Sequence, residues 1–216
     1  MPSIQQIIDY VDRKYPNSET VANKVTDLND IHIQIFVKIA RLKNDFQIYE
    51  TQTIANQLTY SLPTDCTIDN IITAKVSRDT SVSANTKWDD YEYAGLNTDV
   101  TTGHYYSSAG GRIIALLADD KPIATDGLSI RIFYYRSPNA LSSSNMADIP
   151  ELDADYHDLL KYGLIQELAS QGHNPDTEIA DYWQAKYDEL IRAVEDNLSD
   201  KFNKNPTESN QCKEWW

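Results

Sequence analysis

Long hydrophobic runs are absent from this sequence of 216 residues, and no stretch approaches the roughly eighteen apolar residues that a membrane-spanning helix needs. The N-terminus also lacks the basic-then-apolar pattern of a secretory signal peptide. Cysteine is scarce, because only Cys66 and Cys212 are present, and neither belongs to a CxxC pair. Two distant thiols exclude a disulfide framework and zinc sites of that type. We therefore expect a soluble protein, without a membrane partner, whose thiols are free in a reducing cytosol.

Basic residues are scarce as well, with 19 Lys and Arg against 33 Asp and Glu, which gives a net charge of −14. The excess is concentrated in residues 148–200, where fourteen acids face three bases, Lys161, Lys186 and Arg192. Binding to nucleic acid by phosphate neutralisation needs a basic surface, which the sequence does not offer. The acidic segment is therefore either an ordinary solvated face or a surface that repels a polyanion.

No catalytic fingerprint is present, because the sequence contains no GxSxG, P-loop, HExxH or Rossmann pattern. Asp89, Asp90 and Glu92 surround an aromatic residue and are the best candidates for the paired carboxylates of a glycosidase. Acid-rich loops with tyrosines are common on protein surfaces, so the pattern favours no enzyme.

A second acidic group surrounds His157 and consists of Asp153, Asp155 and Asp158. Its spacing lacks the glycine and the terminal glutamate of a calcium loop. Acids at the start of a helix are also what the helix dipole favours. We therefore expect no metal and no cofactor.

Apolar residues recur at helical spacing in the first part of the chain. They predict a short helix capped by Ser3 that ends before Pro16, and a second helix over residues 19–44 with Ser18 as its cap.

Helical spacing resumes beyond Pro150. It predicts a helix capped by Asp153 that ends near Gly172, and a last helix that begins at Pro175. Gly163 lies in the middle of the third helix, where it costs about 1 kcal/mol relative to Ala. A close crossing with another helix would explain it.

Between the helices the hydrophobic period changes from 3.6 to 2. Leu58, Tyr60 and Leu62 alternate with polar residues and predict a strand that Pro63 ends, with Tyr60 and Leu62 in the core. Further strands are predicted at residues 68–76, 112–117 and 128–135, with a short aromatic segment from Trp88 to Gly95 and a segment from Gly103 that runs into a hairpin turn at residues 109–111. The chain before residue 57 is predicted to be helical, so the stretch 58–65 is predicted to mark the change from helices to strands.

This order predicts an α+β fold. Residues 1–46 and 148–202 are expected to form an antiparallel layer of about four helices. Residues 47–147 are expected to form an inserted antiparallel β domain, and residues 203–216 a C-terminal tail.

Aromatic residues are the candidate contact residues. Tyr is enriched at protein interfaces, so the sequence predicts a subunit or tail interface formed by Trp88, Tyr91, Tyr93, Tyr105 and Tyr135. Each tyrosine pair, 105–106 and 134–135, is expected to place one ring in the core and one at the sheet surface. Trp215 and Trp216 end a polar tail, where two indoles bury nothing locally. They either anchor the chain in a partner or pack back on the same chain.

The sequence resembles the head–tail adaptor proteins of tailed bacteriophages between about residues 20 and 195. The resemblance is carried by segments in a shared order: QLTYSLPTD at 57–65, the Tyr pair at 105–106, IRIFYYRSP at 130–138 and DIPELDADYHDLLKYG at 148–163.

The resemblance implies a virion neck protein without enzymatic activity, which is assembled in the host cytoplasm. It implies a ring, a dodecamer, below the portal protein, with the tail or the next neck protein on its other side. Double-stranded DNA would pass through without specific binding, and Trp215 and Trp216 would contact the portal. The alternative from the residues themselves is an acidic carbohydrate- or protein-binding module that uses the aromatics of residues 88–93.

Overall fold

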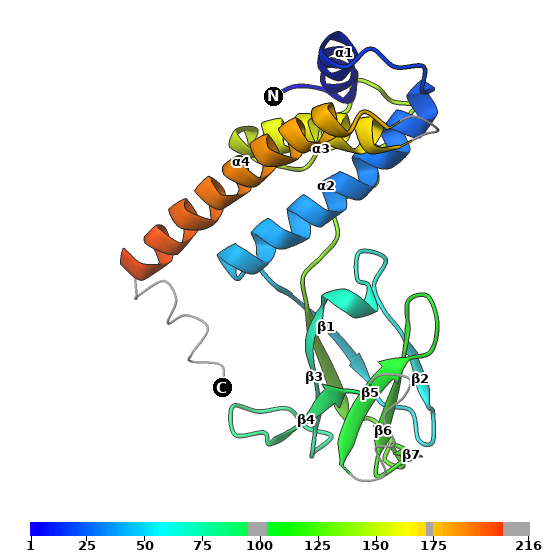
Figure 1. The fold of residues 1–216 in the computed structure, drawn as a ribbon. Coiled ribbons are helices and arrows are strands. Elements are labelled where there is room, and N and C mark those ends of the chain that lie inside the picture. Colours follow the sequence, from blue (N-terminus) through cyan, green and yellow to red (C-terminus); the bar gives the residue numbers. More distant parts are fainter. Residues whose placement is uncertain (95–102, 172–174, 205–216) are drawn as a thin grey trace. The chain divides into compact units, whose positions relative to one another are not determined.

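The computed structural model describes residues 1–94, 103–171 and 175–204, with side chains through Leu198. Two compact units are present (Figure 1). The helical unit comprises Met1–Asn44 and the chain from Pro138 onward, and the sheet unit comprises Asp45–Ser137. In the described ranges the elements are four α-helices and one curled mixed sheet, which confirms the predicted α+β class.

The helical unit contains the four predicted helices. They are α1 (Ile4–Lys14), α2 (Val21–Lys43), α3 (His157–Ser170) and α4 (Thr177–Lys204). Ser3 caps α1 as predicted. Its hydroxyl accepts a hydrogen bond from the Gln6 N–H, while the Gln6 side chain accepts one from the Ser3 N–H. The apolar stripe of α1 is buried, so its helical period places one face in the core.

Two of the predicted helix caps are wrong. Thr20, and not Ser18, caps α2, because its hydroxyl accepts a hydrogen bond from the Asn23 N–H at 3.2 Å. Asp153 does not cap α3, because its carboxylate lies 2.8 Å from Lys43 Nζ and residues Ala154–Tyr156 form a 3-10 turn, η2. The helix α3 therefore begins at His157.

The last helix starts later than predicted. Asp176 accepts a hydrogen bond from the Ile179 N–H at 3.1 Å, so α4 begins at Thr177, beyond Pro175. Gly172, the predicted end of the third helix, lies outside the described residues.

The core of the helical unit is built around α3. This helix contacts α1, α2 and α4, and Leu159, Leu160 and Leu164 are fully buried. Residues 138–147, which the sequence analysis assigned to the β domain, belong to the helical unit. Leu141 and Met146 pack against its core, and the Leu141 N–H donates a hydrogen bond to Asn29 Oδ1 at 2.9 Å.

Gly163 lies where three helices approach one another. A Cβ at this position would lie 3.0 Å from Ile31 Cγ2 on α2 and 3.6 Å from Tyr187 Cε2 on α4. The predicted close crossing is therefore present, because a Cβ at this position would crowd Ile31 while it makes an ordinary contact with Tyr187.

Gly163→Val should destabilise the helical unit by about 1–2 kcal/mol, since overpacking outweighs the small gain in helix propensity. Ile31→Ala in the same chain should recover part of that loss, because it removes the group that the new side chain strikes. Urea unfolding of the single and double variants measures both effects. Ser170→Val, at an exposed position of α3, is the control, and equal losses at 163 and 170 would contradict the prediction.

The sheet unit contains eight strands in the described residues, in the order β1-β8-β3-β4-β5-β6-β2, with β7 beside β6. Their bounds are β1 Gln47–Gln52, β2 Thr59–Ser61, β3 Ile71–Ser77, β4 Trp88–Tyr93, β5 His104–Ser108, β6 Ile113–Ala118, β7 Lys121–Pro122 and β8 Ser129–Tyr134. A 3-10 turn, η1 (Ile68–Asn70), precedes β3.

Three expectations for this sheet are corrected. The sheet is mixed and not purely antiparallel, because β4 and β5 pair in parallel at Glu92–Tyr105 and Tyr93–Tyr106. The strand β1 was not predicted. It pairs with β8 over six residues, although its sequence, QIYETQ, has only a weak alternation. The chain therefore changes from helix to strand at Asn44, and not in the stretch 58–65.

The core of the sheet unit contains Tyr60 and Leu62, as predicted, while Leu58 is 41% exposed. Cys66 is fully buried beside them, and burial raises the pKa of its thiol to about 12. The thiolate is the reactive form, so Cys66 is an inert core residue. Cys212 lies outside the described residues.

Candidate interaction surfaces

Two of the three candidate carboxylates of β4, Asp89 and Asp90, are engaged in separate ion pairs. Asp89 Oδ1 lies 2.6 Å from Arg78 Nη2, and Asp90 Oδ1 lies 3.0 Å from Lys75 Nζ. Neighbouring residues of a strand point to opposite faces, so these two carboxylates do not converge on one substrate.

The acids near His157 are also dispersed. Lys161 Nζ lies 2.7 Å from Asp158 Oδ1, and the buried His157 ring places Nε2 2.9 Å from the Leu152 carbonyl oxygen. Among the described residues no group of three or more His, Cys, Asp or Glu side chains has an arrangement that could hold a metal ion.

The predicted aromatic residues of β4 do not form one platform. The Arg131 guanidinium stacks over the Trp88 ring, and its Cζ lies 4.5 Å from the ring centroid. Tyr91 is only 3% exposed and packs at 5.1 Å from the His104 ring, whereas Tyr93 is 55% exposed. Because Trp88 is an odd number of residues from both tyrosines, its ring faces the other side of the sheet. This geometry disfavours the alternative of a carbohydrate site formed by residues 88–93.

The remaining predicted contact residues differ in exposure. Both Tyr105 and Tyr106 are buried, contrary to the expectation of one ring in the core and one at the surface. In the second pair Tyr134 is buried and Tyr135 is half-buried, as expected. Trp215 and Trp216 lie outside the described residues.

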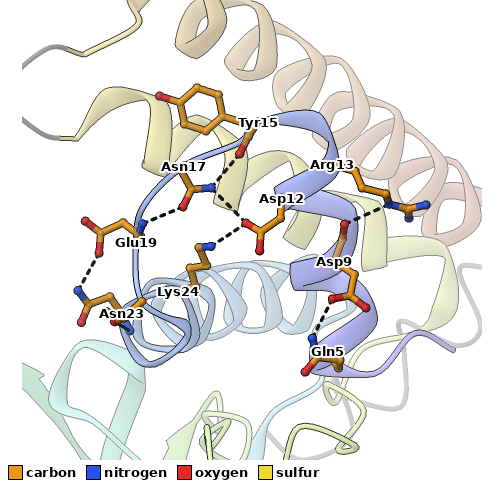
Figure 2. Close-up of polar contacts among 10 residues, drawn as sticks. Gln5, Asp9, Asp12, Arg13, Tyr15, Asn17, Glu19, Asn23 and Lys24 are labelled. Atoms are coloured by element: carbon orange, nitrogen blue, oxygen red, sulfur yellow. Dashed lines mark hydrogen bonds and ion pairs between the residues drawn. The ribbon is translucent and has the colours of Figure 1, made fainter.

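A polar clasp joins α1 to the start of α2 (Figure 2). Lys24 Nζ lies 2.7 Å from Asp12 Oδ1, and Asn17 Nδ2 donates hydrogen bonds to the same oxygen at 3.2 Å and to the Tyr15 carbonyl at 2.8 Å. The Lys24 side chain is only 5% exposed, and that of Asp12 is 41% exposed. The clasp therefore connects α1 to α2 through a buried ammonium group. This ion pair was not predicted from the sequence.

One surface of the helical unit combines aromatic rings with lysines. The Tyr162 and Trp183 rings lie 5.2 Å apart, and the Tyr182 ring lies edge-on to Trp183 at 5.3 Å. On its α1 side, Lys161 Nζ lies 5.1 Å and Lys14 Nζ 5.9 Å from the centroid of the Tyr10 ring. We call the set the aromatic–lysine surface: Tyr10, Lys14, Lys161, Tyr162, Tyr182, Trp183 and Lys186.

A groove of the opposite charge lies between α2, α3 and α4, with a volume of about 350 Å³. We call it the acidic groove. Gly163, Ile31 and Tyr187 line it together with six polar residues: Asp27, Asp30, Gln34, Gln166, Glu167 and Gln184. Partial burial raises the pKa of Asp27, and Glu167, Glu19 and Asp30 raise it further.

Neither surface could be predicted from the sequence, because each combines residues of α3 and α4 with residues of a helix more than a hundred positions earlier in the chain. The one available signal was Tyr182, which lies outside the apolar stripe of α4 and is 56% exposed. Exposed aromatic residues of this kind indicate contact surfaces.

A family model described as SU10 adaptor protein matches residues 2–208, and therefore nearly the whole chain. The chain belongs to this family. The family consists of phage head–tail adaptors, so the resemblance found in the sequence is confirmed. A comparison with curated proteins gave no match.

The adaptor is thus a structural component of a phage particle that associates with other virion proteins. In the described part of the chain no helix is both long and apolar enough to cross a membrane. For an adaptor, the surfaces that contact other proteins are the functional sites. The two helical surfaces and the exposed rings of the sheet unit are therefore the candidates.

Proposed function

We propose that this adaptor forms a ring below the portal protein, joins the DNA-filled head to the tail and lines the channel through which double-stranded DNA passes. The observation that carries the proposal is the extent of the family match, which runs from residue 2 to residue 208 and so includes both units. The adaptor role belongs to the whole chain rather than to one unit.

The charge of the helical unit supports a channel function. Asp181, Glu189 and Asp196 are exposed along α4 and Asp188 is half-buried, against two basic residues, Lys186 and Arg192, among its described side chains. Tight binding to DNA depends on cations that displace the counterions of the phosphates. A channel wall with few cations repels DNA and lets it pass without adhesion.

Three of the sheet aromatics keep exposed surface and are proposed to contact a neighbouring subunit or the tail. They are Trp88, Tyr93 and Tyr135. Tyr91 and Tyr105, which are buried, support the sheet from within.

Reconstitution with the cognate portal protein tests the proposed function. Light scattering should show the adaptor joining the portal oligomer, and electron microscopy of the complex should show a ring coaxial with it. An adaptor that stays monomeric with the portal present would contradict the proposal.

Deleting Gln211–Trp216 should weaken binding to the portal by tenfold or more. Two indoles buried in a partner contribute several kcal/mol in gross terms, of which only part remains after the entropy cost of association. Titration of the portal with the full chain and the truncated chain measures the difference. The matched control is Lys213→Ala, which leaves both indoles in place. Unchanged affinity after the deletion would remove Trp215 and Trp216 from the contact.

A further inference from the structure

We propose that the aromatic–lysine surface of one adaptor molecule packs into the acidic groove of a second copy, so that neighbouring molecules are joined head to tail. This inference rests on the proposed function, since it names the surfaces through which the ring would close.

The aromatic–lysine surface has the composition of a protein contact. Trp and Tyr dominate the binding energy of interfaces, because they bury large rings while their polar atoms still find partners. Here the Tyr162, Tyr182 and Trp183 rings of α3 and α4 are in contact, Lys161 links them to the Tyr10 ring of α1, and Tyr182 is more than half exposed. Tyr10 and Trp183 also pack against the core of their own unit, so Tyr182 is the ring that offers the most surface to a partner.

The lysines on this surface indicate a partner that carries carboxylates. Lys14 and Lys161 lie over the Tyr10 ring, and Lys186 interacts electrostatically with Tyr182 and Tyr162, in a chain whose net charge is −14. Lys161 and Lys186 already pair with Asp158 and Glu189 on their own helices. These acids would repel a nucleic acid, whereas a protein groove can offer carboxylates and amides at matching positions.

The acidic groove provides that chemistry. Its nine lining residues, all within the described chain, include two aspartates, a glutamate and three glutamines but no Lys or Arg. Partial burial raises the pKa of Asp27, and repulsion by the nearby Glu167 and Asp30 carboxylates raises it further. A lysine from another molecule would relieve the repulsion, and the amides would supply hydrogen-bond partners for tyrosine hydroxyls.

The positions of the two surfaces fit a head-to-tail contact. Both involve α3 and α4, but α1 contributes to the aromatic–lysine surface and α2 contributes to the acidic groove. A contact between two identical aromatic–lysine surfaces would leave the carboxylates of the acidic groove without a partner lysine. When the aromatic–lysine surface of one molecule contacts the acidic groove of a second, each of the two molecules keeps its other surface free for a further copy. A series of such contacts closes into a ring when the rotation between neighbours allows it.

A charge-reversal experiment in the full-length chain tests this assignment. Lys186→Glu reverses a charge on the aromatic–lysine surface, and Asp30→Lys reverses one in the acidic groove. Each variant alone should lose at least tenfold in self-association, because each places like charges across the contact. An equimolar mixture of the two variants should recover assembly, since each surface then meets its complement. Sedimentation equilibrium measures the dissociation constants.

Two further reversals on α4 serve as matched controls. Arg192→Glu and Asp196→Lys change the same charges at exposed positions outside both surfaces, and they should leave self-association within about twofold of the native chain. Circular dichroism confirms that every variant is folded.

The outcomes separate the inference from the proposed function. A native chain that assembles, with or without the portal, while Lys186→Glu and Asp30→Lys have no effect would overturn the two surfaces and leave the proposed function standing. Failure of the mixture to recover assembly would equally overturn the pairing. Binding of a DNA duplex that depends on Lys186 while self-association does not would assign the surface to nucleic acid instead. A native chain that stays monomeric with the portal present overturns both.

Discussion

Asp12→Ala should lower the free energy of unfolding of the helical unit by about 3 kcal/mol. The substitution leaves the ammonium group of Lys24, whose side chain is only 5% exposed, without the carboxylate that lies 2.7 Å away. An uncompensated buried charge costs more than the pair contributes when it is intact. The Asn17 side chain also loses one of its two acceptors, which loosens the link between α1 and α2. Urea unfolding followed by helical circular dichroism measures the loss.

Lys24→Met should cost much less, on the order of 1 kcal/mol, because the partner left behind is Asp12, whose half-exposed carboxylate can be hydrated. The double variant should therefore be more stable than Asp12→Ala alone. Glu195→Ala is the matched control, since it breaks a pair with Lys38 in which both side chains are well exposed, and it should cost less than 1 kcal/mol. Equal losses for Asp12→Ala and Glu195→Ala would show that burial of Lys24 has no energetic consequence.

The helices could be predicted because their signal is local. The spacing of Ile4, Ile7, Ile8 and Val11 is set by one turn of helix, and all four side chains are buried. The exact starts could not be predicted where a tertiary contact competes for a cap. Asp153 is the clearest case, because its carboxylate pairs with Lys43, 110 residues earlier in the chain.

The sheet was predicted less completely because pairing is not local. The strand β1 is a strand because β8 provides six pairing partners, while its own residues show only a weak alternation and Ile48 is half-exposed. The parallel pairing of β4 with β5 likewise depends on how the chain returns between them. Only β8, with its buried Ile130, Ile132 and Tyr134, carries a strong local period of two.

The contact surfaces could be predicted least, because they are defined by which residues of different helices come together. Tyr10, Tyr162 and Trp183 belong to three separate helices, and only the packing around α3 makes them neighbours. Conversely, the rings predicted as contacts in the sheet were chosen by residue type. Residue type alone does not distinguish the buried Tyr91 from the exposed Tyr93.

His32 should make the helical unit sensitive to acid. Its ring is fully buried in α2, edge-on to Phe36 at 6.3 Å, and burial lowers its pKa to about 4, with a further lowering by His157 and an opposing effect of Glu151. The unfolded chain binds a proton at about pH 6.5, but the folded chain does so only near pH 4. The free energy of unfolding should therefore fall as the pH drops from 6.5 to 4.

His32→Leu should remove most of this dependence. At pH 7.5 the variant should differ from the native chain by about 1.5 kcal/mol or less, because the leucine fills a similar volume. At pH 4.5 its stability relative to the native chain should be higher by about 2–3 kcal/mol than at pH 7.5. Urea unfolding of both chains at both pH values gives this difference. The contribution of the carboxylates to the pH dependence is common to the two chains and therefore cancels.

The matched control is His104→Gln, which removes an exposed imidazole in the sheet unit and should leave the acid sensitivity of the helical unit unchanged. Burial also lowers the pKa of His157, in spite of its contact with the Leu152 carbonyl, so some sensitivity of the same sign should remain in His32→Leu. If His32→Leu and the native chain lose stability equally between pH 7.5 and 4.5, protonation of His32 is not what destabilises the helical unit in acid. That result would assign the acid sensitivity of the helical unit to the carboxylates and to His157.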